Sequence, residues 1–198
     1  MIYAILRPIA WLLMKVLFFH KATGVENIPT DGGCLFTCNH ISLMDPVFLA
    51  IAVKKRKVHY MAKAELFRNK LFALFIRSLG AFPVKRGAKD ISAIKNAIVM
   101  LEQGHHVGIF PQGKRVKGEK ISRFKPGFVL LAARSECPIV PVYVKTKNQR
   151  IRLFRPIHVV FGKPLTVREL GYTDGSTENL HAVAQRLMGI TEELAGTV

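Results

Sequence analysis

From about residue 32 onward, the chain alternates between short apolar runs that favour β-strands and longer runs with the periodicity of helices. The expected strands are residues 34–38, 58–62, 81–84, 106–110, 138–146 and 157–165. The expected helices are residues 46–54, 65–80, 90–104, 127–136 and 176–194. This alternation is typical of an α/β fold. Because the sequence has neither a repeat nor a long linker, it predicts one such domain over residues 21–198.

The first 20 residues are predicted to form a separate apolar helix. Two basic residues and a proline interrupt its apolar sequence: Arg7, Pro8 and Lys15. The pattern fits neither a membrane-spanning helix, which needs about 20 largely apolar residues, nor a cleaved signal peptide. We expect a helix that lies in the membrane interface, where Arg7 and Lys15 reach the headgroups. Its expected aromatic anchors are Trp11, Phe18 and Phe19. A terminal helix packed against the core is the alternative.

The chain is strongly basic, with 30 Lys and Arg, 13 Asp and Glu, and a formal net charge of +17. Such a field attracts either polyanions or anionic membranes. Two basic runs, residues 54–57 and 114–125, are expected to face the membrane or an anionic substrate. A nucleic-acid-binding module is the rival hypothesis. The sequence lacks a zinc-finger spacing, an aromatic RNA-binding strand and an obvious recognition helix. This hypothesis also leaves the apolar N-terminus unexplained.

Polar clusters follow three of the expected strands. Residues 39–45 (NHISLMD) follow the first strand, residues 85–87 (KRG) the third and residues 111–120 (PQGKRVKGEK) the fourth. Ligand sites of open α/β sheets gather outside the carboxyl ends of the strands. The three clusters therefore predict one shared site.

The first cluster contains His40 and Asp45, five positions apart. Five residues advance about 500° on a helix, so the two side chains meet only across a strand-to-helix turn. There, Asp45 accepts a hydrogen bond from Nδ1–H and leaves Nε2 of His40 free to take a proton from a substrate. The alternative is structural: Asp45 precedes Pro46 as a helix N-cap would, and Ser42 and Asp45 have the spacing of a capping box.

Cys38 offers a different chemistry. It lies two residues before His40, on the same side of an extended segment, so a Cys–His nucleophile forming an acyl-enzyme is conceivable. The alternative is that Cys34, Phe36 and Cys38 form one buried strand face. With Cys137 the chain has three cysteines, an odd number in apolar surroundings, which indicates buried thiols. No Cys/His spacing suggests a metal site, and none is expected.

Taken in order, the motifs resemble those of the glycerolipid acyltransferase family over roughly residues 20–165. NHISLMD matches N-H-x-x-x-x-D, GAFPVKRG matches G-x-F-x-V-x-R, and FPQGKRV is similar to F-P-E-G-T-R. PIVPVYV matches the V-P-[VI] strand, and RFKPGF resembles the K-x-G segment. The resemblance implies a single-domain fold with a central mixed sheet flanked by helices.

It also implies an activity at the cytoplasmic face of a membrane. A fatty acyl group would pass from acyl-CoA or acyl-carrier protein to the free sn-2 hydroxyl of lysophosphatidate, giving phosphatidate without a metal or cofactor. His40 would deprotonate this hydroxyl and Asp45 would orient the imidazole. The implied substrate-binding residues are Asn39, Arg86, Gln112, Gly113, Arg115 and Lys125. Among them, Arg86 would grip a phosphate through two parallel hydrogen bonds.

The third motif departs from the family at two positions. Gln112 stands where the family usually has glutamate, and Lys114 where it usually has threonine. Glutamine keeps a hydrogen-bond acceptor but loses the charge. The departure leaves open an acyltransferase for another lysolipid or for glycerol 3-phosphate, and also a protein that binds lipid without transforming it.

Overall fold

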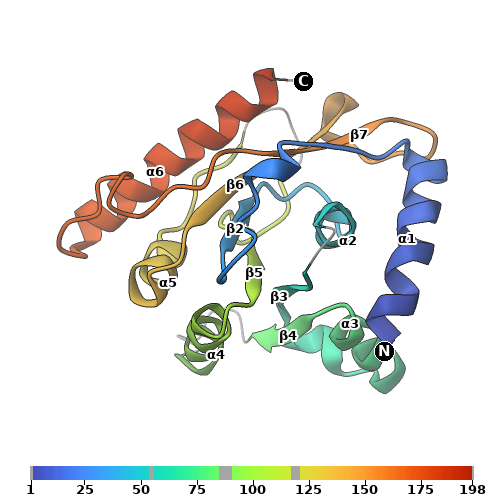
Figure 1. Cartoon of the computed structure of the whole chain (residues 1–198), viewed down its shortest axis with the longest axis horizontal. Helices are drawn as coiled ribbons and strands as arrows, with labels where there is room; N and C mark the ends of the chain where they lie inside the picture. Colours follow the sequence, from blue (N-terminus) through green and yellow to red (C-terminus); the bar gives the residue numbers. More distant parts are fainter. Residues whose placement is uncertain (1, 54–55, 85–90, 117–120, 198) are drawn as a thin grey trace.

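One seven-stranded sheet organises the chain. The structure is a computed structural model that describes residues 2–53, 56–84, 91–116 and 121–197 (Figure 1). The strand order is β1-β7-β6-β2-β5-β3-β4. The strands are β1 (Lys21–Thr23), β2 (Leu35–Cys38), β3 (Val58–Lys63), β4 (Ala81–Val84), β5 (His106–Ile109), β6 (Ile139–Thr146) and β7 (Ile157–Phe161).

The sheet is mixed, as the family resemblance implies. β6 and β7 pair antiparallel, whereas the other neighbouring strands pair parallel. β2 lies in the middle, between β6 and β5. Because β2, β5, β3 and β4 all run in the same direction, their carboxyl ends meet at one edge of the sheet, which is the edge where the polar clusters are expected.

Helices cover both faces of this sheet. They are α1 (Ile2–Phe18), α2 (Asp45–Ala52), α3 (Lys70–Ser78), α4 (Ile91–Glu102), α5 (Gly127–Ser135) and α6 (Thr177–Glu193). In Figure 1, α1 and α2 lie on one side of the strands and α4, α5 and α6 on the other. Alternate residues of β2 serve the two layers: Phe36 and Cys38 pack with α1 and α2, whereas Leu35 packs with α4, α5 and α6.

The expected elements differ from the observed ones in three places. Residues 65–80 are not one helix: a 3₁₀ turn at Ala64–Phe67 precedes α3, and Asn69 caps α3 by accepting the Phe72 N–H at 3.0 Å. The strand expected over residues 157–165 ends at Phe161. Leu165 instead forms an isolated bridge with Ile139. The three-residue β1 is too short to give a sequence pattern.

Helix α1 is partly packed and partly exposed. Met14 and Phe18 are buried, and the Phe18 ring meets Phe48 of α2 edge-on at 5.5 Å. The predicted role of Phe18 as a membrane anchor is therefore wrong, because its ring completes the core. Trp11 and Phe19 are exposed, as anchors must be, while the side chain of Arg7 lies outside the described residues. Among the described helices, none is long and apolar enough to cross a membrane.

Candidate active site

His40 and Asp45 meet across the turn between β2 and α2. The His40 Nδ1 lies 2.8 Å from Asp45 Oδ2, and both side chains are nearly or fully buried. A carboxylate oxygen only accepts, so Nδ1 carries the proton and Nε2 presents its lone pair. The predicted pair is thus in the geometry of a general base and its orienting carboxylate.

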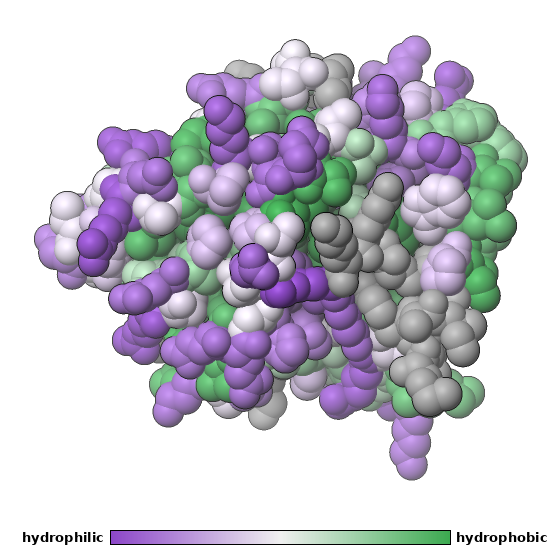
Figure 2. All heavy atoms as spheres, viewed as in Figure 1, coloured by the Kyte–Doolittle hydropathy of each residue, from purple (hydrophilic) through white to green (hydrophobic). Residues whose placement is uncertain are grey.

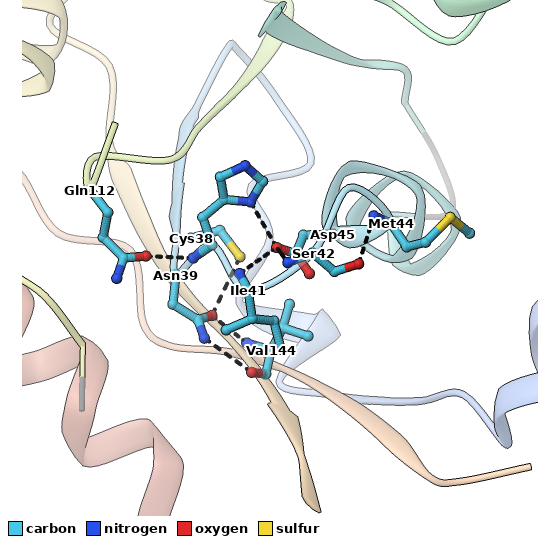
Figure 3. A network of polar contacts seen from close by, with 9 residues as sticks. Cys38, Asn39, Ile41, Ser42, Met44, Asp45, Gln112 and Val144 are labelled. Carbon is cyan, nitrogen blue, oxygen red and sulfur yellow. Dashed lines mark hydrogen bonds and ion pairs between the residues drawn. The ribbon is translucent and has the colours of Figure 1, made fainter. Parts of the chain in front are cut away.

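The same carboxylate oxygen also fixes the turn. Asp45 Oδ2 accepts the backbone N–H of Ile41 at 2.7 Å and that of Ser42 at 2.8 Å (Figure 3). Asp45 is the first residue of α2, whose N-cap is Met44, so it does not cap the helix itself. Half of the expected capping box is present. Ser42 N–H binds the Asp45 carboxylate, but Ser42 Oγ accepts from Met44 N–H at 3.2 Å.

The loop after β5 clamps the backbone of His40 from both sides. The His40 N–H donates to Gln112 Oε1 at 2.5 Å, and the His40 carbonyl accepts from the Val116 N–H at 2.8 Å. Phe110 stacks on the imidazole, with 4.3 Å between ring centroids. These contacts are possible because β2 and β5 are parallel neighbours, so both loops leave the same edge of the sheet.

Gln112 is buried and uses both ends of its amide. Its Nε2 donates to Ser122 Oγ at 3.2 Å, while its Oε1 holds the His40 N–H. A glutamate could accept from both of these partners, so the change from glutamate to glutamine preserves the network. The predicted contact of Gln112 with the acceptor stays a prediction.

Asn39 extends the pairing between β2 and β6. Its Oδ1 accepts the Val144 N–H at 2.7 Å and its Nδ2 donates to the Val144 carbonyl at 3.1 Å (Figure 3). The amide thus imitates one more residue of the ladder and fixes the start of the His40 loop. These bonds give Asn39 a positioning role, and its predicted contact with substrate stays a prediction.

Cys38 is fully buried, and its face of β2 lies in the core with Cys34 and Phe36. Burial raises the pKa of the Cys38 thiol well above its usual range, and the neighbouring Asp45 charge raises it further. The reactive form of a cysteine is its thiolate. The buried-face interpretation is therefore confirmed, and Cys38 is not placed or ionised as a nucleophile.

Gly113 and Lys125 come together beside this network. Gly113 has φ +71°, and a Cβ at this position would lie 3.2 Å from the Lys125 Nζ. The Lys125 N–H also donates to the Pro111 carbonyl at 2.9 Å. Arg115 is exposed on the same loop, one residue before Val116. Lys125 and Arg115 are therefore two exposed cations beside the loop that holds the backbone of His40.

Some predicted features lie outside the described residues: Lys54, Lys55, Arg86 and residues 117–120. β4 ends at Val84, two residues before Arg86, at the same edge of the sheet as His40. Among the residues that the structure describes, no cluster of three or more His, Cys, Asp or Glu could hold a metal ion.

Sequence reasoning missed three contributors to the site. Phe110 lies inside the quoted motif FPQGKRV, and its position two residues before Gln112 was the available signal. Ser122 and Val144 had none, because a hydroxyl ten residues from Gln112 and a backbone group on β6 are brought in only by the tertiary fold.

A histidine held by a carboxylate thus lies at the carboxyl edge of a mainly parallel sheet, in the arrangement of a general base and its orienting group. Residues 20–145 match the family model described as Acyltransferase. The chain belongs to this acyltransferase family, which confirms the resemblance seen in its motifs.

Three known proteins are similar to the chain. The 1-acyl-sn-glycerol-3-phosphate acyltransferase of Bacillus subtilis is 33% identical over 88% of this chain and 87% of its own length. The protein of the same name from Streptococcus pneumoniae is 30% identical over 94% of this chain and 70% of its own length. The crystal structure of the 1-acyl-sn-glycerophosphate acyltransferase PlsC from Thermotoga maritima has a TM-score of 0.70, at 22% identity, over 96% of this chain and 80% of that one. The structural match confirms the fold.

Proposed function

We propose that this protein is a 1-acyl-sn-glycerol-3-phosphate acyltransferase, which esterifies the sn-2 hydroxyl of lysophosphatidate to give phosphatidate. Two relatives of this name are at least 30% identical over most of the chain. The observation that carries the chemistry is the 2.8 Å bond between His40 Nδ1 and Asp45 Oδ2. It leaves Nε2 as a base at the edge where the loops after β2 and β5 meet.

The reaction follows from this geometry. Nε2 of His40 takes the proton of the sn-2 hydroxyl while the alcohol oxygen attacks the carbonyl carbon of the acyl thioester. A C–O bond forms, the C–S bond breaks, and the leaving thiolate takes the proton back from the imidazolium. The Asp45 carboxylate stabilises the imidazolium between these two transfers. General-base catalysis of this kind contributes about 10² to 10⁴ in rate.

Direct attack is favoured over an acyl-enzyme by the burial of Cys38. An acyl-cysteine needs an accessible thiolate, and the Cys38 side chain has neither exposure nor a lowered pKa. The rival hypothesis of a nucleic-acid-binding module gives no account of the His40–Asp45 pair. Gln112 does not argue for lost activity, because its bonds preserve the position of His40.

The cations of the third motif and of the K-x-G segment fit the acceptor phosphate. Lys125 packs over Gly113, and Arg115 follows on the same loop. We assign the acceptor phosphate to these side chains together with Arg86. Acyl-CoA and acyl-carrier protein both remain candidate donors. The cytoplasmic face of the membrane is the proposed place of action, with the exposed part of α1 in the interface.

The test combines each candidate acyl donor with each candidate acceptor. Palmitoyl-CoA and palmitoyl-acyl-carrier protein are each offered with lysophosphatidate, a lysophosphatidylcholine and glycerol 3-phosphate, and the products are identified by mass. The expected result is phosphatidate from lysophosphatidate with at least one donor. Acylation of glycerol 3-phosphate alone, or of the choline lipid at an equal rate, would contradict the proposed acceptor.

A further inference from the structure

Helix α3 is apolar but hardly buried. Its sequence is KLFALFIRS, and Ala73 is its one buried residue. Leu71 is 82% exposed and Leu74 is 62% exposed, and Phe72 and Phe75 are exposed as well. In an amphipathic helix at a surface that faces water, such side chains point toward the core. A contiguous apolar patch of this kind marks a contact with a partner or a membrane.

Three exposed cations lie on the same segment as this apolar face. Arg68, Lys70 and Arg77 are exposed, and the guanidinium of Arg77 lies over the Phe67 ring at 5.0 Å from its centroid. The one acidic residue of this segment, Glu65, is in an ion pair with Lys63 at 3.1 Å. A second copy packed on the same face by two-fold symmetry would bring these cations against one another. An anionic lipid leaflet complements them instead.

The topology places α3 on the same side of the sheet as α1. The crossovers β2–α2–β3 and β3–α3–β4 move in the same direction along the strand order, and right-handed connections put their helices on one face. α1 packs against α2 on that face (Figure 1). α1 also exposes large apolar residues, including Leu12 and Val16, and Figure 2 shows hydrophobic atoms along the edge where α1 runs.

We propose that α3 is a second membrane contact, whose apolar face enters an anionic leaflet while Arg68, Lys70 and Arg77 bind the lipid phosphates. This inference rests on the proposed function in that the acceptor is a membrane lipid. The segment leading to α3 leaves the carboxyl end of β3, the edge that carries His40. Leu43, in the turn between His40 and Asp45, is also exposed. Contact through α1 and α3 thus turns the active-site edge toward the lipid surface.

The test measures partitioning of the full chain onto sedimented vesicles of phosphatidylcholine with and without phosphatidylglycerol. The variant Leu71→Ser/Leu74→Ser removes apolar surface from α3. The matched control Ile91→Ser/Val99→Ser removes it from α4 on the other face, where these residues are 60% and 47% exposed. We expect the α3 variant to lose at least about tenfold in partitioning, because a buried leucine contributes strongly to transfer from water. We expect the control to stay near wild type.

A second variant tests the charge. On vesicles with phosphatidylglycerol, we expect Arg68→Gln/Lys70→Gln to partition about fivefold less for each cation removed. On pure phosphatidylcholine, we expect its partitioning to change little. Equal partitioning of wild type and the α3 variant would overturn the proposal. So would a wild type that fails to bind vesicles, or a lipid-free dimer that Leu71→Ser/Leu74→Ser dissociates, since the occupant would then be a second copy.

Activity measurements distinguish a failure of this inference from a failure of the proposed function. On short-chain lysophosphatidate dissolved as monomers, wild type and Leu71→Ser/Leu74→Ser are expected to react at the same rate. On lysophosphatidate embedded in vesicles, the variant is expected to be slower. If wild type acylates neither form, the proposed function fails, while the partitioning result still decides whether α3 binds membranes.

Discussion

At the scale of single residues, Asp45 combines two tasks that the sequence suggests as alternatives. One carboxylate oxygen orients the His40 ring and also accepts the N–H groups of Ile41 and Ser42. A carboxylate oxygen can accept hydrogen bonds from several donors. The same oxygen therefore holds both the His40 ring and the turn that follows His40. The structural alternative is therefore partly right for this residue, and its catalytic role stays a prediction.

Gln112 gives the residue-scale prediction. Gln112→Ala leaves the His40 N–H without its acceptor, and we expect it to lower the free energy of unfolding by about 1–3 kcal/mol. We also expect a lower kcat with little change in KM for lysophosphatidate, because the histidine is misplaced and not the substrate. Steady-state kinetics and urea denaturation measure both quantities.

Gln112→Glu is the matched control for this variant. Its carboxylate can accept from the His40 N–H and from the Ser122 hydroxyl, so we expect kinetics close to those of wild type. A rise in KM with unchanged kcat in Gln112→Ala would point instead to the substrate contact that the motif predicts.

The site was only partly predictable from its residues. The His40–Asp45 pair could be found because its five-residue spacing fits a strand-to-helix turn and little else. The roles of Asn39 and Gln112 could not, because their partners are a backbone group of β6 and a hydroxyl ten residues away. Short motifs indicate which residues lie near one another in the site. Which group each residue contacts is determined by hydrogen bonds that form only in the tertiary fold.

At the scale of elements, the sheet was more predictable than the helix before β4. Strands such as β5 and β6 have apolar runs with clear breaks, so periodicity finds them. The helix expected over residues 65–80 is shortened because Asn69 caps α3 and a 3₁₀ turn precedes it. The apolar residues of α3 suggest a buried helix, but most of them are exposed.

Gly80 tests how α3 is joined to β4. It has φ +99°, and a Cβ would lie 2.4 Å from the Val58 carbonyl oxygen. We expect Gly80→Ala to lower the free energy of unfolding by more than about 1 kcal/mol, because alanine is strained there and collides with backbone. Urea denaturation measures the change.

Gly189 in α6 is the control for Gly80. A Cβ at Gly189 meets no atom within 4 Å, and the residue is helical. Gly189→Ala should therefore raise the free energy of unfolding by about 0.5–1 kcal/mol. A Gly80→Ala variant that is as stable as wild type, or gains stability as Gly189→Ala does, would show that the Gly80 turn is not as tight as described.

At the scale of the whole molecule, buried histidines predict a loss of stability in acid. Burial, together with nearby positive charges, lowers the pKa of His20 and of His106 to about 4. In the unfolded chain both titrate near about 6.5. Between these values the unfolded state binds protons that the folded state does not, so stability is full above about pH 6.5 and falls toward pH 4.

Thermal unfolding followed across this range measures the effect. We expect the Tm to fall steadily as the pH is lowered from about 6.5. The slope of stability against pH should correspond to protons taken up on unfolding. A Tm that is flat or rises over this range would mean that these imidazoles are protonated in the folded protein.

The central claim is that His40 acts as the general base of acyl transfer. The most direct measurement is the rate of phosphatidate formation by wild type, His40→Ala and Cys38→Ser with the same donor and acceptor. The account predicts a loss of at least about 100-fold in His40→Ala and a rate near wild type in Cys38→Ser. A His40→Ala enzyme that keeps its rate, or a Cys38→Ser enzyme that folds but loses its rate, would contradict it.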